Sequence, residues 1–296
     1  MTSRLLRALA FNDEVRIMVI DAKELVAEAQ RRHDTWQTAT AALGRSLVGT
    51  ALLAANLKGG DRLNVEIQGT GPLGRILCDG DATGHIRGFV EHPHVALELN
   101  EAGKIDVARG VGLPGTFSVR KYIEGSSEPF TGQVDLVSGE LAEDFTYYMA
   151  LSEQTPSAFG LSVLVDTDES VLAAGGFMIQ MLPGASEETI SALEARLQIL
   201  GRFSDYLSQG LSLEALLKLL VGEADYKVLA KEPVGFRCQC THDKLANALK
   251  LLGAAELKEM IEEDGGADLT CHFCRERYHF NESELQTLID ELESKE

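Results

Sequence analysis

The chain has 296 residues, enough for two or three domains, and 45% hydrophobic with 25% charged residues is typical of a globular protein. Acidic residues outnumber basic residues by 46 to 27, and the resulting formal charge of −19 argues against general nucleic-acid binding. No apolar run reaches the roughly 18 residues of a transmembrane helix, and Met1–Ala10 lacks the apolar region of a secretory signal, so we expect a cytoplasmic protein without a membrane span.

Residues 1–183 predict a domain of mixed sheet and helix. Val15–Ile20 is a β-branched run, Ala22–Arg32 has helical character, and Ala39–Leu57 predicts a buried helix. The glycines of that helix, Gly44 and Gly49, either weaken it or mark close packing. Strand-like segments then follow at Arg62–Gln68, Arg75–Cys78, His85–Val90, Gly115–Tyr122, Gly132–Leu136, Leu161–Asp166 and Val171–Ala174. Without regular alternation of strand and helix, the pattern favours the α+β class.

Residues 184–232 predict a helical linker. Ser186, Glu187 and Glu188 form a typical helix start, and two apolar stripes at helical spacing follow. The stripes consist of Ile190, Leu193, Leu197 and Leu200 in the first helix, and Leu213, Leu216, Leu217 and Leu220 in the second. These helices either complete the core as a hairpin or form a detachable cover over an apolar surface.

Residues 233–296 predict a small domain held together by a metal. Helical stretches at Asp243–Leu252, Glu256–Glu263 and Glu282–Glu293 accompany a cluster of four cysteines. A hydrophobic core rarely stabilises a unit of this size alone, so we expect a structural metal ion.

The four cysteines form two close pairs, Cys238-Gln-Cys240 and Cys271-His-Phe-Cys274, separated by 30 residues. Residues i and i+2 of an extended segment point to one face, and a Cys-x-x-Cys turn also brings both sulfurs together. Four thiolates are a typical ligand set for structural zinc, so we predict one tetrahedral zinc ion per chain. Each pair can also be oxidised, but not while its thiolates hold zinc, so the site is a candidate redox switch.

Other residues near the cysteines have simpler interpretations. His242, His272 and His279 are alternative ligands, but with four cysteines available we interpret them as surface or packing residues. Cys78 stands alone beside Asp79-Gly80-Asp81 and is interpreted as a small core residue.

Several functional classes fit the sequence poorly. Residues 237–296 contain 7 Lys or Arg and 14 Asp or Glu, a net charge of −7, which argues against a nucleic-acid-binding zinc ribbon. Four thiolates leave a zinc ion no open position for hydrolysis, and no phosphate-binding glycine motif is present. We therefore expect no enzymatic activity.

The chain resembles the heat-shock protein 33 family, the redox-regulated holdase chaperones of bacteria. The cysteine pattern carries this resemblance together with motifs along the chain, with mild departures at Phe89 and Thr241. These motifs are Ala41-Ala-Leu-Gly-Arg45, Gly71-Pro-Leu-Gly74, Ile86-Arg-Gly-Phe-Val90, Pro93, Ser152-Glu-Gln154, Ala174-Gly-Gly176 and Gln180-Met-Leu-Pro183.

The resemblance implies a zinc-bound, inactive reduced state in which Cys238, Cys240, Cys271 and Cys274 are the ligands. It further implies that oxidation forms the disulfides Cys238–Cys240 and Cys271–Cys274, releases zinc, and unfolds the small domain. The active form, typically a homodimer, would bind unfolding client proteins without ATP. Two alternatives stay open: a constitutive zinc-stabilised interaction protein and a thiol-disulfide oxidoreductase.

Overall fold

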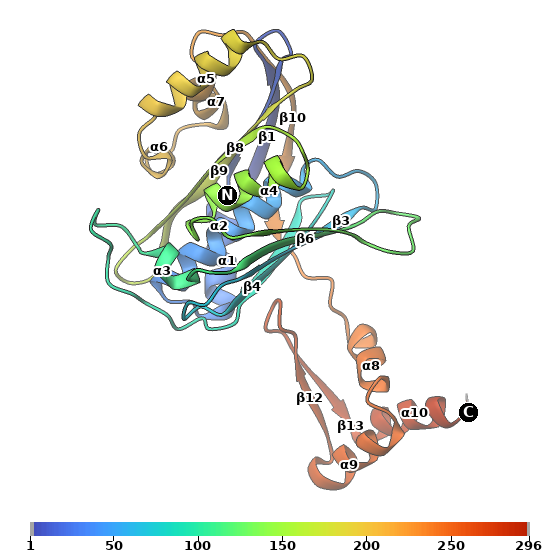
Figure 1. The fold of residues 1–296 in the computed structure, drawn as a ribbon. Coiled ribbons are helices and arrows are strands. Elements are labelled where there is room, and N and C mark those ends of the chain that lie inside the picture. The colour runs from blue at the N-terminus through green and yellow to red at the C-terminus, as the bar shows by residue number, and fades with distance from the viewer. Residues whose placement is uncertain (1–2, 295–296) are drawn as a thin grey trace. The chain divides into compact units, whose positions relative to one another are not determined.

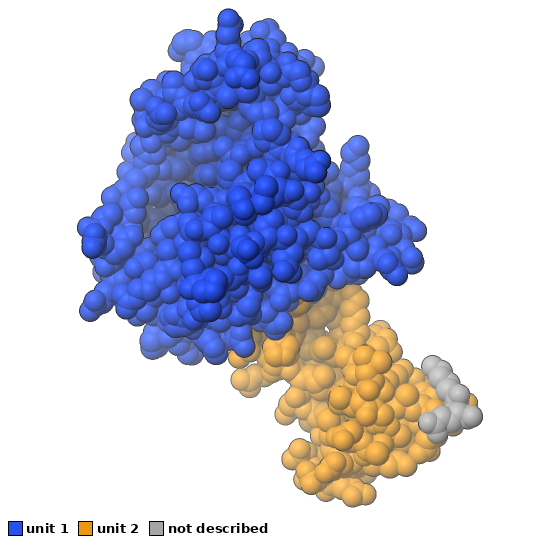
Figure 2. Space-filling model, in the orientation of Figure 1, with its two compact units in different colours: residues 1–237 blue, residues 238–296 orange. Residues whose placement is uncertain are grey.

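The computed structural model describes residues 3–294 and divides the chain into two units, residues 1–237 and 238–296, shown in blue and orange in Figure 2. The first unit begins with the β1–β2 hairpin and the helices α1 and α2 (Figure 1). Its strands are β1 (Arg4–Ala10), β2 (Val15–Asp21), β3 (Arg62–Gln68), β4 (Arg75–Asp81), β5 (His85–Val90), β6 (Thr116–Tyr122), β7 (Phe130–Asp135), β8 (Ser157–Val165), β9 (Val171–Met181), β10 (Tyr226–Pro233) and β11 (Gly235–Phe236). Its helices are α1 (Lys23–His33), α2 (Gln37–Ala54), α3 (Val107–Val111), α4 (Ala142–Leu151), α5 (Glu187–Ile199), α6 (Phe203–Ser208) and α7 (Leu213–Val221).

Two sheets organise the first unit. One has the strand order β10-β1-β2-β9-β8, and the other has the order β11-β5-β4-β3-β6-β7. All neighbouring strands are antiparallel except β11 and β5. This arrangement confirms the predicted α+β class.

Helix α2 lies between the two sheets and contacts strands of both. It is buried almost throughout, which its small side chains permit. A Cβ atom at Gly49 would lie 2.4 Å from the Phe145 ring, and one at Gly44 would lie 2.7 Å from a methyl group of Val26. Both glycines therefore mark close packing, the second of the two interpretations open from the sequence.

The second unit consists of α8 (His242–Lys250), α9 (Ala254–Asp264), β12 (Gly266–Thr270), β13 (Arg277–Asn281) and α10 (Glu282–Glu293). The two strands form an antiparallel hairpin. Its core is small and is formed by Leu249, Leu257, Phe280, Leu285, Leu288 and Ile289. A core of six side chains agrees with the expectation that this unit needs further stabilisation.

The boundary between the units lies after Arg237, whereas the sequence predicted one before Pro233. Val234 is buried in the core of the first unit, and β11 pairs with β5, so this stretch belongs to the first unit. Within 184–232, the helices α5 to α7 are followed by β10, which joins a sheet beside β1. The division of the chain into a core domain, a linker and a metal-binding domain stays a prediction. Residues 1–2 and 295–296, which it includes, lie outside the described residues.

Most predicted segments are present, several with the expected bounds. β3, β5 and α10 match their predicted ranges, and the expected last hairpin is the longer pair β8–β9. Elements that the sequence did not predict are β1, β10, β11, α3, α4, α6 and the β12–β13 hairpin. Among residues 3–294, every helix is too short or too polar to span a lipid bilayer.

Candidate metal centre

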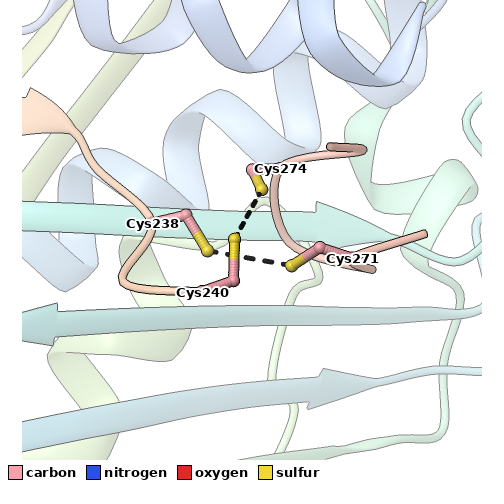
Figure 3. Close-up of side chains that lie close together, drawn as sticks. All are labelled: Cys238, Cys240, Cys271 and Cys274. Carbon is pink, nitrogen blue, oxygen red and sulfur yellow. Dashed lines mark hydrogen bonds between the residues drawn. The ribbon is translucent and has the colours of Figure 1, made fainter. Parts of the chain in front are cut away.

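The four cysteines of the second unit converge on one point (Figure 3). Cys238 and Cys240 come from the extended segment before α8, and Cys271 and Cys274 come from the turn between β12 and β13. All four Sγ atoms lie within 4.8 Å of one another. Two separations join one pair to the other: 3.8 Å between the sulfurs of Cys238 and Cys271, and 3.3 Å between those of Cys240 and Cys274.

This geometry fits a tetrahedral metal ion. Zinc–sulfur bonds of about 2.3 Å place the sulfurs of a tetrahedral site about 3.8 Å apart. The separation of 3.8 Å between Cys238 and Cys271 equals that value, the 3.3 Å between Cys240 and Cys274 is somewhat shorter, and none of the four cysteines forms a disulfide. Cys271 and Cys274 are buried, with 8% and 4% exposure, whereas Cys238 and Cys240 are half-buried. The residues can therefore hold one metal ion, with one pair of ligands closer to solvent.

A tight hairpin turn positions Cys271 and Cys274. The amide of Arg275 donates to the carbonyl of Cys271 at 2.8 Å, and the amide of Cys271 donates to the carbonyl of Glu276 at 2.9 Å. Arg275 has a φ of 60°, in the left-handed region, which lets the chain reverse before β13. The amides of Cys274 and Phe273 donate to the sulfur of Cys271, so the turn supplies hydrogen bonds as well as ligands.

The electrostatics of the cluster favour a bound cation. Burial raises the pKa of the Cys271 thiol, and burial together with the neighbouring Cys240 and Cys271 raises the pKa of Cys274. Without a cation, these thiols would stay protonated at neutral pH. A divalent ion offsets the charge of the four thiolates and stabilises the deprotonated form.

The sequence analysis missed Tyr278, which also contacts the cluster. Its Oη lies 3.2 Å from Cys240 Sγ and 3.3 Å from the carbonyl oxygen of Cys240. The hydrogen bond to Cys240 raises the pKa of Tyr278, so its hydroxyl stays protonated. Tyr278 lies 38 residues along the chain from Cys240, and no local pattern in the sequence connects them.

The three histidines lie outside the group that could hold a metal. His242 stacks on the ring of Phe280, with centroids 4.1 Å apart, and its Nε2 is 3.6 Å from a carboxylate oxygen of Glu284. His279 Nδ1 lies 2.9 Å from a carboxylate oxygen of Asp268. His272 is exposed in the turn. The interpretation of these side chains as packing or surface residues is confirmed.

Cys78 lies in the core of the first unit. It is fully buried on β4, and burial raises the pKa of its thiol well above the ordinary value. Its interpretation as an unreactive core residue is confirmed.

Helices α5 and α7 lie against one face of the β10-β1-β2-β9-β8 sheet (Figure 1), and all residues of their predicted apolar stripes except Ile190 pack there. We call this packing the outer cluster; its buried members are Leu6, Ala8, Ala10, Val15, Ile17, Val19, Phe177, Ile179, Leu193, Phe203, Leu216, Leu217, Leu220 and Val221. Leu197, Leu200 and Leu213 are partly buried against it. Ile190 is half-buried and outside the cluster, while its neighbour Thr189 is buried.

Polar contacts attach the helices to this sheet and to each other. Ser186 caps α5, and its amide and hydroxyl donate to a carboxylate oxygen of Glu14 at 2.9 and 2.8 Å. Arg196 Nε donates to the carbonyl oxygen of Leu219 at 2.7 Å, which joins α5 to α7. Glu214 of α7 forms an ion pair with Lys231 of β10. A few exposed or half-exposed polar contacts thus supplement the apolar packing.

Comparison with known proteins gives one consistent result. A family model described as "Hsp33 protein" matches residues 3–281. The chain is 52% identical to a 33 kDa chaperonin of Shouchella clausii over 295 residues, and the match covers 100% of both chains. It is also 52% identical to a 33 kDa chaperonin of Enterococcus faecalis over 291 residues, which covers 98% of this chain and 97% of the other. The crystal structure of a 33 kDa chaperonin, a heat shock protein 33 homolog of Thermotoga maritima, superimposes with a TM-score of 0.92 at 36% identity and covers 100% of both chains.

Proposed function

The chain belongs to the Hsp33 family, and from this premise we propose that it is a redox-regulated holdase that binds unfolding proteins without ATP. It is a chaperone, as its relatives are named, and not an enzyme. The observation that carries the redox part of the proposal is the convergence of four cysteine sulfurs, none of them in a disulfide, within 4.8 Å.

In the reduced state, Cys238, Cys240, Cys271 and Cys274 are proposed to hold one zinc ion. When bound, zinc would keep the four sulfurs deprotonated and contribute folding free energy of the order of 10 kcal/mol to the second unit. The separations between the sulfurs and the small core of residues 238–296 support this assignment.

Oxidation is proposed to remove the ligands. In each pair, two thiols lose two electrons and two protons, an S–S bond forms, and a peroxide is reduced to two molecules of water. The family resemblance favours the disulfides Cys238–Cys240 and Cys271–Cys274. Sulfurs of different pairs also lie close together, at 3.8 Å for Cys238 and Cys271 and 3.3 Å for Cys240 and Cys274, so the pairing stays a proposal that peptide mapping by mass spectrometry would test.

Loss of the second unit's fold is proposed to loosen α5, α6 and α7. The chain runs from α7 through the edge strand β10 and the short β11 directly into Cys238, which gives a covalent route for the coupling. Movement of these helices would expose the sheet side of the outer cluster, including Leu6, Ile17 and Phe177. A contiguous apolar surface of this kind is suited to binding unfolded clients.

The remaining parts of the proposal concern location and assembly. We propose a cytoplasmic protein that forms a homodimer on activation and keeps its client complexes in solution through its charge of −19. The same charge disfavours nucleic acid as a partner.

The test is light scattering from a thermally unfolding client, with reduced zinc-loaded protein compared with peroxide-treated protein while released zinc is recorded. We expect suppression of aggregation only after zinc release. Equal activity in both states would favour the constitutive interaction protein, and turnover of a disulfide substrate with a dithiol would favour an oxidoreductase.

A further inference from the structure

We propose that Lys244 is a positioning residue for the metal ligands Cys238 and Cys240, and that its side chain strengthens zinc binding. The inference rests on the proposed zinc site and adds to it a residue outside the four ligands. It is carried by a hydrogen bond of 2.7 Å from Lys244 Nζ to the carbonyl oxygen of Gln239, the residue between the two cysteines.

The two ligand pairs are held by different kinds of structure. Cys271 and Cys274 come from the turn of the β12–β13 hairpin, whose antiparallel strands pair over their whole length. The segment Cys238-Gln239-Cys240 lies outside helix and strand. Because no strand ladder fixes this segment, the positions of its two sulfurs depend more on contacts with side chains.

The first turn of α8, next to this segment, is well anchored. The Thr241 side chain caps the helix and accepts a hydrogen bond from the Lys244 amide at 3.2 Å. His242 stacks on Phe280 of β13, with ring centroids 4.1 Å apart. The start of α8 is therefore attached to the hairpin that carries the other ligand pair.

Lys244 reaches back from this turn to the ligand segment. Its amide donates to Thr241 and its ammonium group donates to the Gln239 carbonyl, so one residue closes a loop around Cys240. The next carbonyl, that of Cys240, accepts a hydrogen bond from the Tyr278 hydroxyl at 3.3 Å. Two neighbouring carbonyl groups of the segment are thus held, one from α8 and one from β13, and this preorganises the sulfurs for a metal ion.

The charge of Lys244 also suits this place. A zinc ion and four thiolates together carry excess negative charge, and residues 237–296 already contain 14 acidic and only 7 basic side chains. The helix dipole disfavours a cation in the first turn of a helix, so α8 by itself gives no reason for a lysine here. Beside the ligand segment, the ammonium group offsets negative charge, although solvent screens this effect because Lys244 is exposed.

The test uses the full-length protein with Lys244→Met, which keeps most of the unbranched side chain and removes the ammonium group. Zinc affinity is measured under reducing conditions by competition with a chromogenic chelator. We expect a dissociation constant about 10-fold higher than in the unsubstituted protein, the low end of the usual effect of groups that support metal ligands. Lys244→Arg, whose guanidinium group can donate to the same carbonyl, should restore the affinity to within about 2-fold.

Lys258→Met is the matched control. It makes the same change of charge and size in the same unit, and it removes a surface ion pair with Glu293. We expect its zinc affinity to be unchanged. In zinc-loaded Lys244→Met protein, hydrogen exchange should be faster in residues 238–245 and unchanged in α10, which distinguishes a local effect on the ligand segment from general destabilisation.

An unchanged zinc dissociation constant in Lys244→Met would overturn the proposal. Equal weakening by Lys258→Met would also contradict it, because net charge and not position would then be responsible. Loss of protection in α10, or a Lys244→Arg protein as weak as Lys244→Met, would contradict it too. If the unsubstituted protein bound no zinc, the proposed metal site itself would be wrong, so the two failures are distinguishable.

Discussion

Glu14 stabilises the start of the covering helices through a charged contact. Its carboxylate, in the turn between β1 and β2, accepts hydrogen bonds from Thr189 and from the amide and hydroxyl of Ser186. These hydrogen bonds lower the pKa of Glu14 below its ordinary value of 4.5, and the bond from Thr189 has the largest effect. The same contact explains why Ile190 lies outside the outer cluster. Thr189, which bonds to Glu14, occupies the buried position that the sequence pattern had assigned to Ile190.

This contact predicts a dependence of stability on pH. Because the pKa of Glu14 is lower in the folded state, its contribution is fully present above 4.5 and is lost as the pH falls through the folded-state value. We expect Glu14→Ala to lower the melting temperature at neutral pH and to have a progressively smaller effect as the pH falls below 4.5. Thermal unfolding measured by circular dichroism across this range, with the exposed Glu101→Ala as control, checks the prediction. An effect of the same size at both ends of the range would contradict it.

At the scale of the element, α7 illustrates how local signals and packing agree. Ser212 caps the helix, Gly222 ends it, and Leu216, Leu217 and Leu220 are fully buried in the outer cluster. The sheet beneath them is apolar on both faces, because alternate residues of β2 belong to the outer cluster and to the main core. Such a sheet needs a cover on each side.

We predict that Leu216→Asn raises holdase activity of the reduced, zinc-loaded protein. A polar side chain at this buried position weakens the attachment of α7 and exposes the sheet beneath it more often. Light scattering from an unfolding client measures the activity, and circular dichroism shows whether the fold persists. Ile199→Asn, at a position of α5 that is 74% exposed, should leave the activity unchanged. A folded but inactive Leu216→Asn protein would argue against the role of α7 as a cover.

At the scale of the whole molecule, the two units differ in what stabilises them. Residues 1–237 contain a continuous core around α2 together with the outer cluster. Residues 238–296 have six buried core side chains besides the cysteine cluster. The stability of the second unit should therefore depend on the proposed metal ion far more than that of the first unit.

Removal of zinc by a chelator under reducing conditions should unfold the second unit and leave the main core intact. Hydrogen exchange followed by mass spectrometry should show loss of protection in α8, α9 and α10, with protection of α2 retained. Readdition of zinc should restore the protection. If the second unit stayed protected without metal, its core alone would suffice for folding, and loss of zinc could not be the trigger of the switch.

The sequence by itself determined the elements that depend on local interactions, and it pointed to the candidate metal ligands. Helix caps act within one turn, so Ser186 identified the start of α5. Apolar periodicity identified seven of the eight residues assigned to the covering stripes, because one face of a helix is fixed by its geometry. The two close cysteine pairs likewise indicated a shared candidate metal site, because their residue type and spacing are typical of one.

Only the tertiary structure decided which distant segments meet. Strand β1 pairs with β10, which comes from the far end of the first unit, and the side chain of Arg7 forms an ion pair with Glu232. No local sequence pattern predicts this strand pairing. The same is true of Tyr278 and Cys240, which are brought together by the hairpin register and by packing around Phe280. Such contacts depend on the topology of the chain, and many alternative topologies satisfy the same local preferences for helix and strand.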